Sequence, residues 1–552
     1  DGDLTVFGGS LVVNTDDDWR LDGTMTLIAG TVSGQDLTVA NGGSVVAGAF
    51  LSGADSAIDA AVTFEADSST TVVTDCELDL TGAIVYDGGS FDGDGTLIQN
   101  NNAQVTGDTT ISTATFDWDG SNGNSTTTVD AGVTLTIDSD AVDTSANNDF
   151  DGTLHVGSGA TVTVNTATDW RLDGELNFTN SGAIPHLGGS ATMMVQGDVN
   201  VSGGEADIDS PVQFDTAANV TVAAGAELEV NGAATVEGGT YNLDDGTLDF
   251  DGALSIGNAT FNDVGAAGTA FVQFDGVTTY AGGTIDSTAT LNQYADATVN
   301  GATVINGSVV NLDGGGTTTV TLNDDLTINA DKLDSDGNKF DGTLNINNPG
   351  YLQVATTAGS WTMAGTMNLD QNGQPNTYLV RGDDINITGQ VTVTGATAMN
   401  AAAHISGTVT LGDADDLLQL GGGGNTLSGG EIVGPGRLAA VGTALNNSLT
   451  GYGTISADIK FSGSDSDLLA DRGTLSVSGE ILDVDDIGTA SSTGTLNMAN
   501  AWNTDTADEL RLNGGVVTGG GITNDGTTIG HGAITSSWLV NNSTLTADGG
   551  TL

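Results

Sequence analysis

The sequence predicts an all-β protein: a single long, right-handed parallel β-helix (β-solenoid) with little or no α-helix. Three observations lead to this fold class. Short alternations of apolar and polar residues recur along the 552 residues, turn-forming Gly, Asp and Asn separate them, and longer segments repeat. Alternation with a period of two is typical of strands that bury one face. The right hand is expected from strand twist and from the handedness of parallel connections.

The predicted strands are short and regularly spaced. Typical alternations are TVTV at 161–164, LTIN at 326–329 and VTVTG at 391–395. Turn residues follow each of them, and the tripeptide GTL recurs, for example at Gly95, Gly246 and Gly473. Gly and Asn supply the left-handed backbone conformations that tight corners require.

Longer repeats divide the chain into modules. Segments that begin at Asp1, Asp151 and Asp341 open with DGDLTV, DGTLHV and DGTLNI, and a different pair starts at Leu449 and Thr527. We therefore expect one solenoid built from modules at 1–150, 151–340 (extended) and 341–448, followed by a C-terminal repeat pair at 449–552.

Stacked coils explain these repeats better than a string of antiparallel sandwiches does. Each strand buries only one face, so neighbouring coils must stack to form a continuous core and to align ladders of Thr, Val and Asn. Ig-like sandwiches would show about seven strands per 100 residues and a repeated core pattern. Coils of about 20 to 25 residues would give about 22 to 28 coils in all.

The charge is strongly negative, with 72 acidic residues against 9 Lys and Arg and a formal net charge of −63. Such a surface repels nucleic acid and anionic membranes, so neither partner is expected. Divalent cations and high salt would relieve the repulsion, although solubility alone is an alternative reason for the acidity. No apolar run is long enough to span a membrane. The lone cysteine, Cys76, excludes an intrachain disulfide and is interpreted as a buried small hydrophobe.

Two segments carry a resemblance to known proteins. GYGTISADIKFSGSDSDLLADRGTLSVSG, from Gly451, and GGSFDGDGTLIQNNNAQVTGDTTI, from Gly88, resemble the Gly-rich β-helix repeats of large bacterial surface proteins. These include autotransporter-type passenger domains and filamentous adhesins. The resemblance covers nearly the whole chain in style, and it implies export and a role in adhesion, surface layers or fibres. It transfers no site residue.

The motif DWRLDG is the most distinctive local feature. It occurs at 18–23 and 169–174, and a third copy, SWTMAG at 360–365, keeps only the Trp and the Gly. Trp19, Trp170 and Trp361 are therefore candidates either for packing at module junctions or for stacking on a glycan. The loss of the polar partners in the third copy favours packing, because a binding site needs them.

The segment DKLDSDGNKFDG at 331–342 suggests a metal site, with Asp334, Asp336 and Asp341 as candidate ligands. Calcium takes six to eight oxygen ligands, many of them carboxylates. The spacing departs from the EF-hand loop, because Gly337 comes too early and no Glu closes the loop. No cofactor is required by this interpretation, and calcium is the ion that the acidic clusters suggest.

Catalysis has little support, and we expect no enzyme activity. The four histidines show no ligand spacing: they are His155, His186, His404 and His531. Polysaccharide-active β-helix enzymes share the predicted architecture, but their polyanionic substrates would meet a repulsive surface.

The leading hypothesis is an extracellular or cell-surface structural protein that forms a fibre, filament or layer. The chain begins and ends inside a repeat, so we expect either a continuation in a longer chain or head-to-tail self-association. An adhesin that binds glycans or surfaces along the solenoid is the first alternative, and a polysaccharide-active enzyme is the second.

Overall fold

The computed structural model contains β-strands and no helix in the part of the chain that it describes. The described residues are 2–15, 17–48, 53–120, 125–144, 148–265, 269–314, 317–334, 338–371, 378–422, 424–441, 449–462, 467–484, 486–506 and 508–552. Strand makes up 62%, in parallel sheets that form a β-solenoid of about 24 turns. The predicted fold class and number of coils are therefore confirmed. Among the described residues, no helix has the length and apolarity to cross a membrane.

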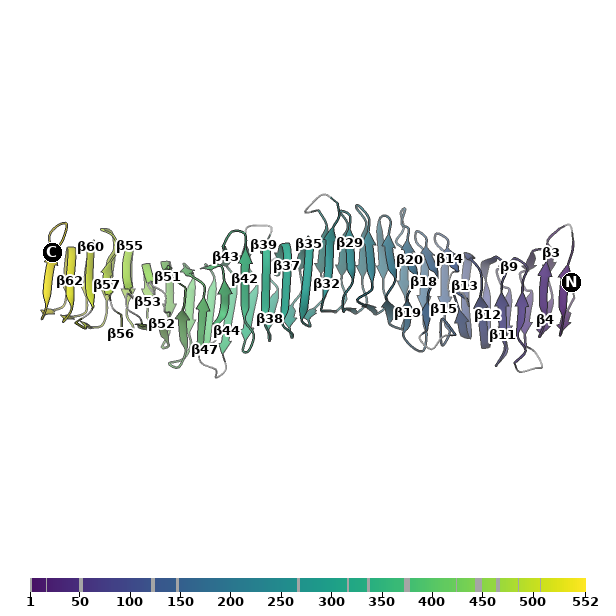
Figure 1. The fold of residues 1–552 in the computed structure, drawn as a ribbon, viewed down its shortest axis with the longest axis horizontal. Coiled ribbons are helices and arrows are strands. Elements are labelled where there is room, and N and C mark those ends of the chain that lie inside the picture. The colour runs from purple at the N-terminus through teal and green to yellow at the C-terminus, as the bar shows by residue number, and fades with distance from the viewer. Residues whose placement is uncertain are drawn as a thin grey trace. The chain divides into compact units, whose positions relative to one another are not determined.

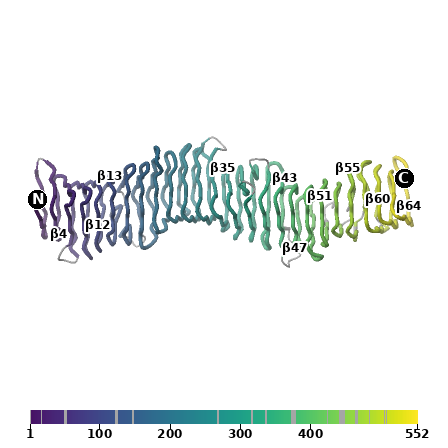
Figure 2. Tube along the Cα trace, turned by 180° about the vertical axis from the view of Figure 1, so that it is seen from behind, coloured from purple at the N-terminus to yellow at the C-terminus, as the bar shows by residue number. Residues whose placement is uncertain are grey.

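The chain forms two compact units. The first comprises Asp1–Val277 with Ser287–Ala289, and the second comprises Thr278–Asp286 with Thr290–Leu552. Within each unit the strands stack side by side, turn after turn (Figures 1 and 2).

In the first unit, each central coil contributes three short strands, and each strand pairs in parallel with the equivalent strand of the next coil. Leu154, Leu176, Val199 and Val220 lie in register at intervals of 22, 23 and 21 residues. The strands are β16 (Asp149–Phe150), β17 (Thr153–Val156), β18 (Thr161–Val164), β19 (Trp170–Leu172), β20 (Glu175–Phe178), β21 (His186–Gly188), β22 (Met193–Val195), β23 (Asp198–Val201), β24 (Glu205–Ile208), β25 (Val212–Phe214), β26 (Asn219–Val222), β27 (Glu227–Val230), β28 (Ala234–Val236), β29 (Thr240–Leu243), β30 (Thr247–Phe250), β31 (Leu254–Ile256) and β33 (Phe271–Phe274).

The second unit repeats this plan. Strands β38 (Thr319–Leu322), β41 (Thr343–Asn347), β44 (Thr366–Gln371) and β47 (Gln390–Asn400) stack in register through Val320, Leu344, Met367 and Val391. Its last strands are β62 (Thr527–Ser536), β63 (Leu539–Asn541) and β64 (Thr544–Ala547).

The core fills the interior of each coil, because alternate side chains of every strand point inward. In β18, for example, Val162 and Val164 are buried while Thr161 and Thr163 are only partly covered. The outward residues form the ladders expected from the sequence. Asn323 donates to Asn300 at 3.0 Å, and Asn347 donates to Asn323 at 3.0 Å, each one coil further along.

Candidate functional site: stacked carboxylates on the first unit

The three tryptophans of the DWRLDG motif lie on strands. Trp19 begins β3 (Trp19–Leu21), Trp170 begins β19, and Trp361 lies in β43 (Ser360–Met363). Trp170 and Trp361 are each 1% exposed, whereas Trp19 is half-buried. A ring that is 1% exposed has no face for a sugar, so Trp170 and Trp361 act in packing.

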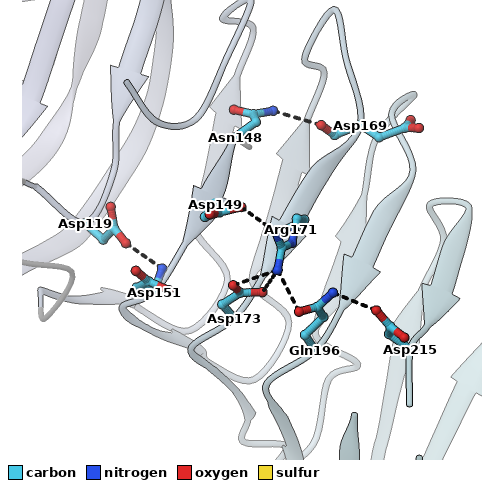
Figure 3. A network of polar contacts seen from close by, with 9 residues as sticks. All are labelled: Asp119, Asn148, Asp149, Asp151, Asp169, Arg171, Asp173, Gln196 and Asp215. Carbon is cyan, nitrogen blue, oxygen red and sulfur yellow. Dashed lines mark hydrogen bonds and ion pairs between the residues drawn. The ribbon is translucent and has the colours of Figure 1, made fainter. Parts of the chain in front are cut away.

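The arginine of the second motif copy ties neighbouring coils together (Figure 3). Arg171 lies 3.0 Å from Asp173, 3.5 Å from Asp149 and 2.6 Å from the side-chain oxygen of Gln196. Gln196 in turn donates to Asp215 at 2.6 Å. Asp149, Arg171, Gln196 and Asp215 belong to consecutive coils, so this chain of contacts runs along the stack.

Arg20 of the first copy is also paired. It lies 3.0 Å from Asp22 and makes two hydrogen bonds to Glu65. These bonds, together with one from the backbone N–H of Asn41, hold the pKa of Glu65 below its ordinary value. Both arginines of the motif therefore neutralise nearby carboxylates.

Two of the three candidate metal ligands of the sequence are described, and Asp336 lies outside the described residues. The Nζ atom of Lys339 lies 2.6 Å from the carboxylate of Asp341. The backbone N–H of Asp341 donates a hydrogen bond to the carboxylate of Asp313. Burial raises the pKa of Asp313, and the charges of Asp334 and Asp341 add to that rise. A metal site in this loop stays a prediction.

In a similar turn of the first unit, buried carboxylates accept hydrogen bonds from backbone N–H groups. Asp117 accepts hydrogen bonds from the N–H of Gly120 at 2.8 Å and from the hydroxyl of Thr144 at 3.2 Å. Asp119 accepts from the backbone N–H of Asp151 (Figure 3). Burial raises the pKa of Asp117 to about 6 and that of Asp119 to about 7. These acids have structural partners already.

Among the described residues, a dense set of ionisable groups lies on the outward face of β21, β24, β27 and β30. His186, Asp207, Glu229 and Asp249 occupy equivalent positions on these four strands. Glu205 and Glu227 form a second, adjacent column. Adjacent strands of a sheet are about 4.8 Å apart, and like charges directly opposite each other are destabilising. The name acidic ladder is used below for the ionisable side chains of this face, which are His186, Glu205, Asp207, Glu227, Glu229, Asp249, Asp251 and Asp275.

Two groups of three carboxylates converge within the acidic ladder. Oxygens of Glu205, Asp207 and Glu229 lie within 4.8 Å of one another, and so do oxygens of Asp249, Asp251 and Asp275. Each group is built around a buried acid, because Asp207 is 6% exposed and Asp249 is 8% exposed.

One oxygen of each buried acid is left without a donor. The Oδ1 atoms of Asp207 and Asp249 have no hydrogen-bond partner among the described residues. The other oxygens are occupied: Asp207 Oδ2 lies 3.1 Å from His186 Nδ1, and Asp249 Oδ2 accepts from Gln273 at 3.2 Å. A buried polar atom without a partner costs free energy, so a ligand at these positions would be stabilising.

The electrostatics of the acidic ladder follow from this crowding. Burial raises the pKa of Asp207 to about 6 and that of Asp249 to about 7, and neighbouring negative charges contribute to both. Burial and a hydrogen bond with Glu205 also raise the pKa of Glu229. Only Arg20 and Arg171 supply fixed positive charge before Lys332, and both pair with other acids. Neither arginine therefore offsets the negative charge of the acidic ladder.

Sequence reasoning missed the acidic ladder because it looked for consecutive aspartates in loops. The available signal was acidic residues at outward strand positions, in EADID at 205–209, ELEVN at 227–231 and TLDFD at 247–251. Asp207, Glu229 and Asp249 are 22 and then 20 residues apart. Since the coil length varies, the alignment of these acids becomes visible only in the strand register.

No protein-family model and no curated protein matches the chain. The strand pairing and the repeated coils show that the chain is a β-solenoid repeat protein.

Proposed function

We propose that the chain is an extracellular structural protein whose acidic β-solenoid forms part of a surface fibre, filament or layer. The observation that carries this proposal is the uniform stacking of coils in both units, with side chains filling the core and polar ladders outside. Such an array resists extension along its stacking direction because every coil is hydrogen-bonded to the next. The resemblance to Gly-rich repeats of bacterial surface proteins supports the same role.

Self-association is the second part of the proposal, with another copy of the chain as the partner. Strands β63 and β64 expose apolar side chains: Leu539 is 39% exposed, Val540 is 46% exposed and Leu545 is 49% exposed. Exposed strand edges with apolar side chains are templates for pairing with another chain. In this proposal a coil of a second copy, and not a following coil of the same chain, covers these residues and extends the parallel stack.

Sedimentation velocity and negative-stain microscopy of the purified chain test this proposal. We expect linear oligomers at high salt, where repulsion between negatively charged copies is screened. Leu545→Asp should abolish them, whereas Val264→Asp, at a site that is 57% exposed in the first unit, should leave them intact. Monodisperse monomers of the parent chain under all conditions, or equal loss in both variants, would overturn the assembly proposal.

A further inference from the structure

We propose that Glu205, Asp207 and Glu229 of the acidic ladder form a divalent-cation site, and that Ca²⁺ is the ion that fits it best. This inference concerns the first unit alone. It does not depend on the structural role or on self-association.

The distances suit one ion. Calcium binds oxygen ligands at about 2.3–2.6 Å, so two ligands on opposite sides of it lie about 4.6–5.2 Å apart. Oxygens of the three carboxylates lie within 4.8 Å of one another, which lets a single ion contact all three. Two of the acids come from β24 and one from β27, so the ion would link adjacent coils.

A second observation, independent of the clustering, points to a ligand at this place. Asp207 is 6% exposed, and its Oδ1 has no hydrogen-bond donor among the described residues. A buried carboxylate oxygen without a donor is costly, whereas a coordinated cation satisfies it. The neighbouring set repeats the arrangement, because Asp249 also has a buried Oδ1 without a partner next to Asp251 and Asp275.

The donor set selects the class of ion. All three ligands are carboxylates, which hard cations prefer, and their different lengths suit the flexible coordination of Ca²⁺ better than the strict octahedron of Mg²⁺. His186 lies 3.1 Å from Asp207 Oδ2 and 3.3 Å from Asp209 Oδ2. It therefore flanks the site beside Asp207.

Calorimetric titration of the chelator-treated chain with CaCl₂, at neutral pH and high ionic strength to suppress non-specific binding, tests the site directly. Glu229→Gln removes the ligand that joins the two coils and is nearly isosteric. Glu237→Gln is the matched control, because Glu237 is exposed and follows β28, outside the acidic ladder. Thermal melting in Ca²⁺ and in chelator gives a second readout.

We expect the parent chain and Glu237→Gln to bind Ca²⁺ saturably and to melt at higher temperature with it. Glu229→Gln should lose at least one saturable site and part of the Ca²⁺-dependent shift. An equal Ca²⁺ response in all three chains would mean general screening and would overturn the site. A parent chain without saturable Ca²⁺ binding would also overturn it.

Discussion

At the scale of single residues, the role of a side chain depends on whether it points into the coil or out of it. Cys76 is 1% exposed, which confirms the interpretation of the lone cysteine as a small buried hydrophobe. His155 lies on the outward face between Thr128 and Asn177 of adjacent coils. Asp207 faces outward too, yet it is almost completely covered by its neighbours. The place of a residue in the apolar–polar alternation therefore predicts whether its side chain points inward or outward. Its solvent exposure depends on the adjacent coils.

Trp170→Ala tests the packing role of the motif. The ring is 1% exposed, so its removal should destabilise the first unit by about 3–5 kcal/mol through lost burial and a residual cavity. Urea unfolding followed by far-UV circular dichroism measures the loss. Trp538→Ala is the control, because Trp538 is 46% exposed and surface substitutions usually change stability by less than about 0.5 kcal/mol. Equal effects of the two substitutions would contradict a packing role for Trp170.

At the scale of the structural element, each corner of a coil must fit against the corner below it. Gly152, Gly174 and Gly197 occupy one such corner in successive coils of the first unit. A Cβ on Gly174 would lie 2.0 Å from the carbonyl oxygen of Gly152, and one on Gly197 would lie 1.9 Å from that of Gly174. Neither Gly174 nor Gly197 has a positive φ. The requirement here is for space between backbones, so the spacing of the coils excludes any side chain.

Gly197→Ala should therefore reduce stability much more than the difference in backbone propensity between Gly and Ala would by itself. Backbone must move to relieve the contact, which costs about 1–3 kcal/mol or more for an overpacked site. Gly182→Ala is the matched control, because nothing lies within 4 Å of the added Cβ. Thermal melting of the two variants measures the difference. A Gly197→Ala variant as stable as Gly182→Ala would refute the close-contact argument.

At the scale of the whole molecule, charge is the dominant property. Acidic residues outnumber Lys and Arg by 72 to 9. Stacking places many of these acids at equivalent positions of successive coils, where they repel one another. Burial, with a smaller contribution from neighbouring negative charges, raises the pKa of several acids; they include Asp117, Asp119, Asp207 and Asp249. We therefore expect the stability of the fold to respond to pH, salt and divalent cations.

Stability should fall as pH rises, in the absence of divalent cations. Burial raises the pKa of Asp119 and Asp249 from 3.8 to about 7. Between these values the folded chain holds protons that the unfolded chain releases, so the contribution is greatest at low pH and is lost as pH rises through the folded pKa. Melting temperature in chelator should thus decrease between about pH 4 and about pH 7. Asp249→Asn should show a shallower decrease, and a melting temperature that is flat or rises with pH would contradict the prediction.

The sequence by itself determined the parallel solenoid, the number of coils and the inward and outward faces of strands such as 161–164. Alternation, turn residues and repeats are local, and they recur often enough to define a coil. The acidic ladder was decided only by the tertiary structure. Asp207, Glu229 and Asp249 come from coils of unequal length, so their alignment depends on the register of strand pairing. The burial of Trp170 and the missing donor at Asp207 Oδ1 likewise depend on neighbouring coils, because coverage is a property of the stack.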